Sequence, residues 1–142
     1  MNRVVIDTNV IVSAFLLKGR SARSILRLCF SGQVKPIVGN ALFLEYEEVA
    51  GRQKLFAKSP LSKLERQQFL DDFLSLCEWI PIYYLWRPNL KDEADNHIME
   101  LAVAGMADTI FTSNIKDFQH MQLLFPNVSI TTPYNYLHAK ES

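Results

Sequence analysis

The chain has 142 residues, in which 15 Lys and Arg residues balance 15 Asp and Glu residues. This length favours a single domain over residues 1–142, and the 49% of hydrophobic residues is enough for one packed core. Zero net charge excludes the long-range attraction to nucleic acid that a strongly basic protein has, so any polyanion must be bound locally.

The first part of the chain predicts a strand followed by a helix. Residues 4–6 are a short β-branched run that ends at Asp7, which is the pattern of a strand buried on both faces. From Ser21 onward, apolar residues recur at helical spacing, and Gly32 is placed to end this amphipathic helix. An acid therefore stands at the carboxyl end of a buried strand.

The middle of the chain continues the alternation. Residues 36–38 predict a second strand, and Asn40 is expected to cap the helix that follows. Ser62 and Glu65 have the spacing of a capping box, which opens the next helix. Residues 79–84 then predict a third strand.

The last part of the chain completes an α/β pattern. Acidic residues within 92–95 favour a helix start, because they complement the dipole at a helix N-terminus. Residues 109–112 and 128–130 predict the fourth and fifth strands, and residues 132–133, Thr then Pro, predict the cap and first position of a final helix. Strands separated by helices imply right-handed crossovers and hence a parallel sheet with helices on its faces.

Four carboxylates follow the strands of this sheet. Asp7 ends the first strand, Glu45 lies in the helix after the second, Asp95 opens the helix into the fourth, and Asp117 follows the fourth. Ligands of open α/β sheets bind beyond the carboxyl ends of the strands. Carboxylates gathered there repel one another, and protonation or a divalent cation relieves the repulsion. Oxygen ligands of this kind suit Mg²⁺ or Mn²⁺.

The order of motifs along the chain resembles a known family. Residues 5–14, VIDTNVIVSA, are similar to the opening motif of PIN domains, particularly the small PIN-domain toxins of bacterial toxin–antitoxin pairs. The resemblance continues at residues 45–49, 91–96, 107–118 and 132–133, in the family's order and over nearly the whole chain.

This resemblance implies a three-layer α/β/α fold with a five-stranded parallel sheet in the order 3-2-1-4-5. It also implies hydrolysis of RNA phosphodiester bonds with Mg²⁺ or Mn²⁺, at matching catalytic and metal-binding acids Asp7, Glu45 and Asp95. Many members carry an acid where this chain has Asn114, so the fourth ligand is Asn114, Asp117 or absent. The expected partners are RNA, an antitoxin protein and a second copy of the chain.

Substrate contacts are expected on one helix. Arg20, Arg23 and Arg27 are spaced to share a face opposite the apolar stripe, where they could hold RNA phosphates. A solvated helix face is the alternative interpretation. Thr112 at the end of the fourth strand is assigned to the substrate with them, and His97 is interpreted as a partly exposed side chain rather than a catalytic group.

Two features concern the environment of the protein. Cys29 and Cys77 lie in apolar helical segments without metal-ligand spacing, which predicts reduced core thiols. No apolar run approaches the ~18 residues needed to span a bilayer. A soluble cytoplasmic protein without a membrane partner is therefore expected.

Two other functions stay open. A phosphohydrolase of small phosphate esters could use clustered carboxylates, although such enzymes commonly carry a second acid shortly after the nucleophilic Asp, which residues 7–9 lack. A catalytically weak or inactive PIN-like module that binds RNA or protein is favoured by Asn114 and by the zero net charge.

Overall fold

The structure is a computed structural model that describes residues 2–52, 54–82 and 93–140, without the side chains of residues 93–96, 121 and 140. In this part of the chain, strands pair in parallel in the order β3-β2-β1-β4-β5. The strands are β1 (Asn2–Ile6), β2 (Val34–Val38), β3 (Glu78–Trp79), β4 (Thr109–Phe111) and β5 (Ser129–Thr131). The predicted α/β class and strand order are confirmed.

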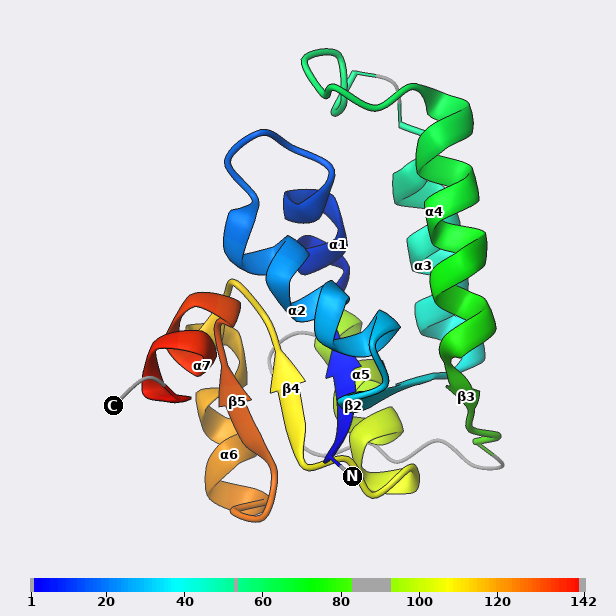
Figure 1. The fold of residues 1–142 in the computed structure, drawn as a ribbon. Helices are drawn as coiled ribbons and strands as arrows, with labels where there is room; N and C mark the ends of the chain where they lie inside the picture. Colours follow the sequence, from blue (N-terminus) through cyan, green and yellow to red (C-terminus); the bar gives the residue numbers. More distant parts are fainter. Residues whose placement is uncertain (1, 53, 83–92, 141–142) are drawn as a thin grey trace.

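Helices cover both faces of the sheet (Figure 1). They are α1 (Thr8–Ala14), α2 (Arg20–Phe30), α3 (Asn40–Ala50), α4 (Lys63–Leu76), α5 (Glu93–Ala104), α6 (Gln119–Leu124) and α7 (Pro133–Lys140), with a 3₁₀ helix η1 (Ile115–Phe118). Helix α2 contacts β2 and α5 contacts β1, while α3 and α4 lie side by side beyond one end of the sheet (Figure 1). Within the described ranges, no helix has both the length and the apolar content to cross a lipid bilayer.

The central strand β1 is the centre of the core. Its residues Val4, Val5 and Ile6 are at most 1% exposed, as expected for a strand with neighbours on both sides and helices on both faces. The backbone N–H of Asp7 donates to the carbonyl of Phe111 at 2.9 Å, which continues the pairing of β1 with β4 by one residue. Asp7 is therefore held by backbone contacts at the carboxyl edge of the sheet.

Most of the helix-end signals predicted from the sequence are confirmed. Ser62 and Glu65 form the predicted capping box at the start of α4. Gly32, with φ of +79°, follows α2. The prediction for Asn40 is wrong, because Gly39 is the N-cap of α3 and Asn40 is its first helical residue. The amide of Asn40 is thus left at the helix start without a capping role.

The third strand is shorter than predicted. Strand β3 covers Glu78–Trp79, and one further hydrogen bond joins the N–H of Ile80 to the carbonyl of Val38. Pro81 has no N–H to continue the pairing with β2, which explains the end of the strand. Residues 83–84 of the predicted strand lie outside the described residues.

Other helical segments were not predicted. Helix α1 is apolar at most positions, so its sequence shows no clear helical period, and η1 with α6 fills a stretch that was left unassigned. Cys29 and Cys77 are buried free thiols, as expected, and burial raises the pKa of each to about 12. Their thiolate forms are therefore strongly disfavoured.

Candidate metal-binding active site

Asp7 is held by hydrogen bonds on both of its carboxylate oxygens. Oδ1 accepts from the backbone N–H of Thr8 at 2.8 Å, and Oδ2 accepts from Oγ1 of Thr112 at 2.8 Å and from Nδ2 of Asn9 at 3.2 Å. The residue is 8% exposed. Burial raises the pKa of Asp7 and the nearby charge of Glu45 adds to the rise, while the hydrogen bonds from Thr112 and Thr8 oppose it.

Glu45 is the second carboxylate of the cluster and comes from α3. Its Oε1 accepts a hydrogen bond from Oγ1 of Thr8, and its Oε2 lies 2.9 Å from Nε2 of His97 on α5. Thr8 therefore joins the two carboxylates, since its N–H binds Asp7 and its hydroxyl binds Glu45. The hydrogen bond with His97 is the main cause that lowers the pKa of Glu45. The Glu45 side chain is 35% exposed, so it can be reached from solvent.

His97 is the site residue that sequence reasoning undervalued. Its side chain is 18% exposed, as the interpretation of a partly exposed residue expected, but its Nε2 also contacts Glu45, which was not predicted. The two residues are 52 positions apart in the chain, and only the packing of α5 against α3 brings them together. No spacing in the sequence signals this contact.

The loop after β4 is tied to the same cluster. Oδ1 of Asn9 accepts from the N–H of Ser113 at 3.1 Å, and Oγ1 of Thr112 accepts from the N–H of Asn114 at 3.1 Å. Thr112 is completely buried, so it positions Asp7 instead of facing a substrate. Asn9 and Thr112 thus fix the first carboxylate and the loop beside it as one unit.

The metal-binding roles of Asn114, Asp117 and Asp95 stay predictions. Asn114 is the N-cap of η1 and Asp117 is one of its residues, and both side chains are exposed. Among the side chains that the structure describes, no three His, Cys, Asp or Glu residues form a metal-binding group, so Asp117 does not join Asp7 and Glu45. The side chain of Asp95, in the first turn of α5, lies outside the described residues.

The predicted arginine stripe divides into two kinds of residue. Arg20 and Arg27 are exposed on α2. Arg23 instead turns inward, and its guanidinium donates to the carbonyls of Leu16 at 2.5 Å and Ala14 at 3.2 Å. Ala14 is the last residue of α1 and Leu16 follows its C-cap, so Arg23 holds the end of α1 against α2.

A family model of the PIN domain matches residues 3–116. The chain belongs to the PIN-domain family. A chain in the crystal structure of VapBC2 from Rickettsia felis bound to a DNA fragment from their promoter aligns with a TM-score of 0.57 and 23% identity, covering 90% of this chain and 96% of that chain. This likeness shows a common fold. A search of curated proteins found no match.

The donor set of this PIN domain fits a hard divalent cation. Asp7 and Glu45 contribute carboxylate oxygens, the ligands that Mg²⁺ and Mn²⁺ prefer. The two carboxylates share one site, and Asp7 is buried, which disfavours its charged form. A bound cation would compensate this charge, whereas the hydrogen-bond donors already present only partly do so.

Proposed function

We propose that this PIN domain is a metal-dependent endoribonuclease that hydrolyses RNA phosphodiester bonds. The observation that carries the proposal is the pair Asp7 and Glu45, joined through Thr8 at the carboxyl edge of the sheet. A buried carboxylate beside a second one is costly for the apo protein, and metal-assisted phosphodiester hydrolysis needs such a pair.

Asp7, Glu45 and Asp95 would hold Mg²⁺ or Mn²⁺ in this proposal. Asp95 lies in the first turn of α5, the helix that also carries His97. The bound ion supplies positive charge to the attacked phosphate and makes a nearby water more acidic.

The residues around the carboxylates keep them oriented. Asp7 accepts three hydrogen bonds from Thr8, Thr112 and Asn9, which leave its carboxylate little rotational freedom. Glu45 is the more accessible carboxylate and can take a proton from the attacking water, because it faces solvent and its lowered pKa keeps it ionised. His97 positions it from the side of α5.

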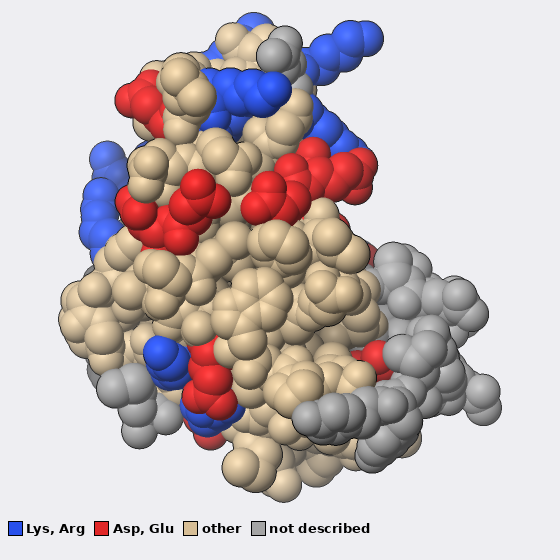
Figure 2. All heavy atoms as spheres, turned by 90° about the vertical axis from the view of Figure 1, so that its right-hand side faces the viewer, with Lys and Arg blue, Asp and Glu red and all other residues tan. Residues whose placement is uncertain are grey.

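RNA phosphates would bind at the Asp7 end of the cluster. Lys18 and Arg20 line a cavity of about 250 Å³ together with Ser113, which follows the buried Thr112. Its two cations and hydroxyls are suited to phosphate oxygens. The face around α4 and β3 shows side chains of both signs and no single basic field (Figure 2). Exposed Arg27 on α2 is the further candidate for a phosphate contact.

We also propose that the protein is the toxin of a toxin–antitoxin pair that acts in the cytoplasm and forms a homodimer. The support is the shared fold with a chain of VapBC2 from Rickettsia felis. Co-expression with the product of the adjacent reading frame tests the proposal, because an antitoxin should co-purify with the chain and suppress its activity. Size measurement of the isolated chain tests the dimer.

Cleavage of an RNA oligonucleotide by the purified chain tests the nuclease. We expect cleavage with Mg²⁺ or Mn²⁺, none with a chelator, and none from Asp7→Asn or Glu45→Gln. Glu48→Gln is the matched control, because Glu48 lies on the same helix but pairs with Arg52 at the surface. RNA binding without cleavage would favour a non-catalytic module, and turnover of a simple phosphomonoester in place of RNA would favour a small-molecule phosphohydrolase.

A further inference from the structure

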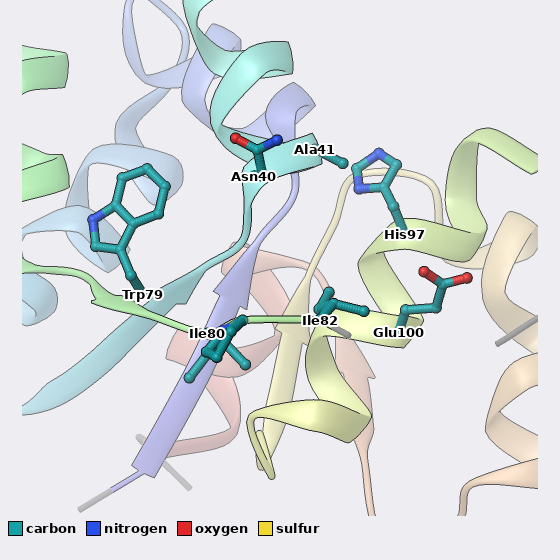
Figure 3. Close-up of a pocket in the computed structure, with 8 residues that line it drawn as sticks. Asn40, Ala41, Trp79, Ile80, Ile82, His97 and Glu100 are labelled. Atoms are coloured by element: carbon teal, nitrogen blue, oxygen red, sulfur yellow. The ribbon is translucent and has the colours of Figure 1, made fainter. Parts of the chain in front are cut away.

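A cavity of about 560 Å³ adjoins the carboxylate cluster on the side of α5 (Figure 3). His97 belongs to both sites, since its Nε2 contacts Glu45 and its ring lines the cavity. Asn40 and Glu45 lie on α3, and His97 and Glu100 lie on α5, so both helices contribute to the cluster and to the cavity. The cavity is therefore an extension of the candidate active site.

One side of the cavity is apolar. Trp79 of β3 stands on the side opposite His97 of α5 and is 49% exposed, and Ile80 and Ile82 lie between them (Figure 3). Pro81 also lines the cavity. The indole is supported from behind by Phe43, at a ring-centroid distance of 5.2 Å. An exposed indole held in place by a second ring is suited to stacking against another planar group.

The polar groups of the cavity favour a neutral ligand over an anion. Among the described residues that line it, none is Lys or Arg, and Glu100 contributes a carboxylate that is 5% exposed. The described lining therefore offers a phosphate no Lys or Arg side chain with which to pair. Asn40 does not cap α3 and makes no side-chain hydrogen bond to any described residue, so its amide can donate and accept towards the cavity.

We propose that this cavity binds an unpaired nucleobase of the RNA, next to the phosphate that is cleaved. The base stacks on Trp79, and Asn40 hydrogen-bonds to its edge. The proposal rests on the ribonuclease function proposed above. The contrast with the cavity at Lys18 and Arg20 supports it, because that cavity has two cations and reaches Ser113, next to the Thr112 that binds Asp7, whereas none of the described residues that line this one is Lys or Arg. Stacking accepts any base, whereas an amide can discriminate among base edges.

Nucleoside binding to metal-free protein tests the cavity without requiring cleavage. The chain has two Trp residues, so Trp86→Phe leaves Trp79 as the single tryptophan. We expect guanosine, adenosine, cytidine and uridine to change its fluorescence saturably, and ribose 5-phosphate to have no effect. In this background Asn40→Ala should reduce the differences in affinity among the four nucleosides. A response to an arginine-containing peptide in place of nucleosides would overturn the proposal and indicate a protein-binding surface.

RNA oligonucleotides provide the second measurement. Trp79→Ala should weaken binding of a short single-stranded RNA by about 5- to 150-fold, the usual contribution of one aromatic stack, whereas Trp79→Phe should retain most of the affinity. An abasic nucleotide beside the mapped cleavage site should weaken binding to the parent but not to Trp79→Ala, since the two changes remove the same contact. Additive losses would overturn the inference.

The two proposals fail in different ways. If nucleosides bind at Trp79 but the protein cleaves no RNA with any metal, the proposed nuclease function is wrong and the base site remains. RNA cleavage that is unaffected by Trp79→Ala, together with no response to nucleosides, would remove the base site and leave the nuclease.

Discussion

The hydroxyl of Thr112 offers the sharpest test of the carboxylate cluster. Thr112 is completely buried, and its Oγ1 donates to Oδ2 of Asp7 at 2.8 Å and accepts from the N–H of Asn114 at 3.1 Å. Thr112→Val removes these hydrogen bonds with little change of shape. Thr112→Ser is the matched control, because it keeps the hydroxyl and removes only the methyl group.

The expected loss of stability follows from the charged acceptor. A hydrogen bond to a charged group contributes about 1.5–3 kcal/mol, so Thr112→Val should lower the free energy of unfolding by about 2–3 kcal/mol at neutral pH. The N–H of Asn114 adds little, since this residue is exposed and water can replace the hydroxyl. Loss of one buried methyl group in Thr112→Ser should cost about 1 kcal/mol.

The pH dependence separates the hydrogen bond from simple packing. Burial raises the pKa of Asp7 and the hydrogen bond from Thr112 lowers it, so Thr112→Val should raise this pKa further. A carboxyl with a raised pKa in the folded state stabilises the protein when protonated and loses that contribution as the pH rises through the folded pKa. The cost of Thr112→Val should therefore be largest at neutral pH and smaller in acid.

Urea unfolding of the parent and both variants in metal-free buffer, at neutral and at acidic pH, measures these differences. RNA cleavage provides a second reading, because its acidic limb should move to higher pH in Thr112→Val and stay in place in Thr112→Ser. Equal losses of stability in both variants at both pH values would show that the hydroxyl does not support an ionised Asp7, and the reasoning would be refuted.

Three further predictions use other parts of the site. Asp7→Asn should abolish cleavage and leave the metal-free protein as stable as the parent or more so, because it removes a buried charge; parental cleavage in Mg²⁺ would contradict the mechanism. Asn114→Asp should tighten divalent-metal binding if residue 114 faces the cation, whereas Asp117→Asn should weaken it only if Asp117 is the fourth ligand. Metal titrations decide between the two, and no change in either would leave a site of three acids. Arg23→Ala should lower the free energy of unfolding by about 1–3 kcal/mol through the lost bonds to the end of α1, while Arg27→Ala should leave stability unchanged and reduce the salt dependence of RNA binding. Equal stability of these last two variants would contradict the assigned roles.

Much of the architecture could be predicted from the sequence because its signals are local. The buried run before Asp7, the capping box of Ser62 and Glu65 and the Gly at residue 32 each act over a few residues of chain. The alternation of strands and helices then limits the topology to parallel crossovers. The sequence by itself also determined that Asp7 ends a buried strand, which is why a charge there needed partners.

The tertiary structure decided how these groups are used. Glu45 meets His97 across 52 residues of chain, and Thr8 meets Glu45 across 37, because α1, α3 and α5 pack together at one edge of the sheet. Thr112 and Arg23 were assigned to a substrate from their position and spacing, yet Thr112 is buried against Asp7 and the guanidinium of Arg23 binds backbone carbonyls near the end of α1. The direction of a side chain depends on which neighbour lies within reach after the helices pack. Local sequence patterns do not specify that neighbour.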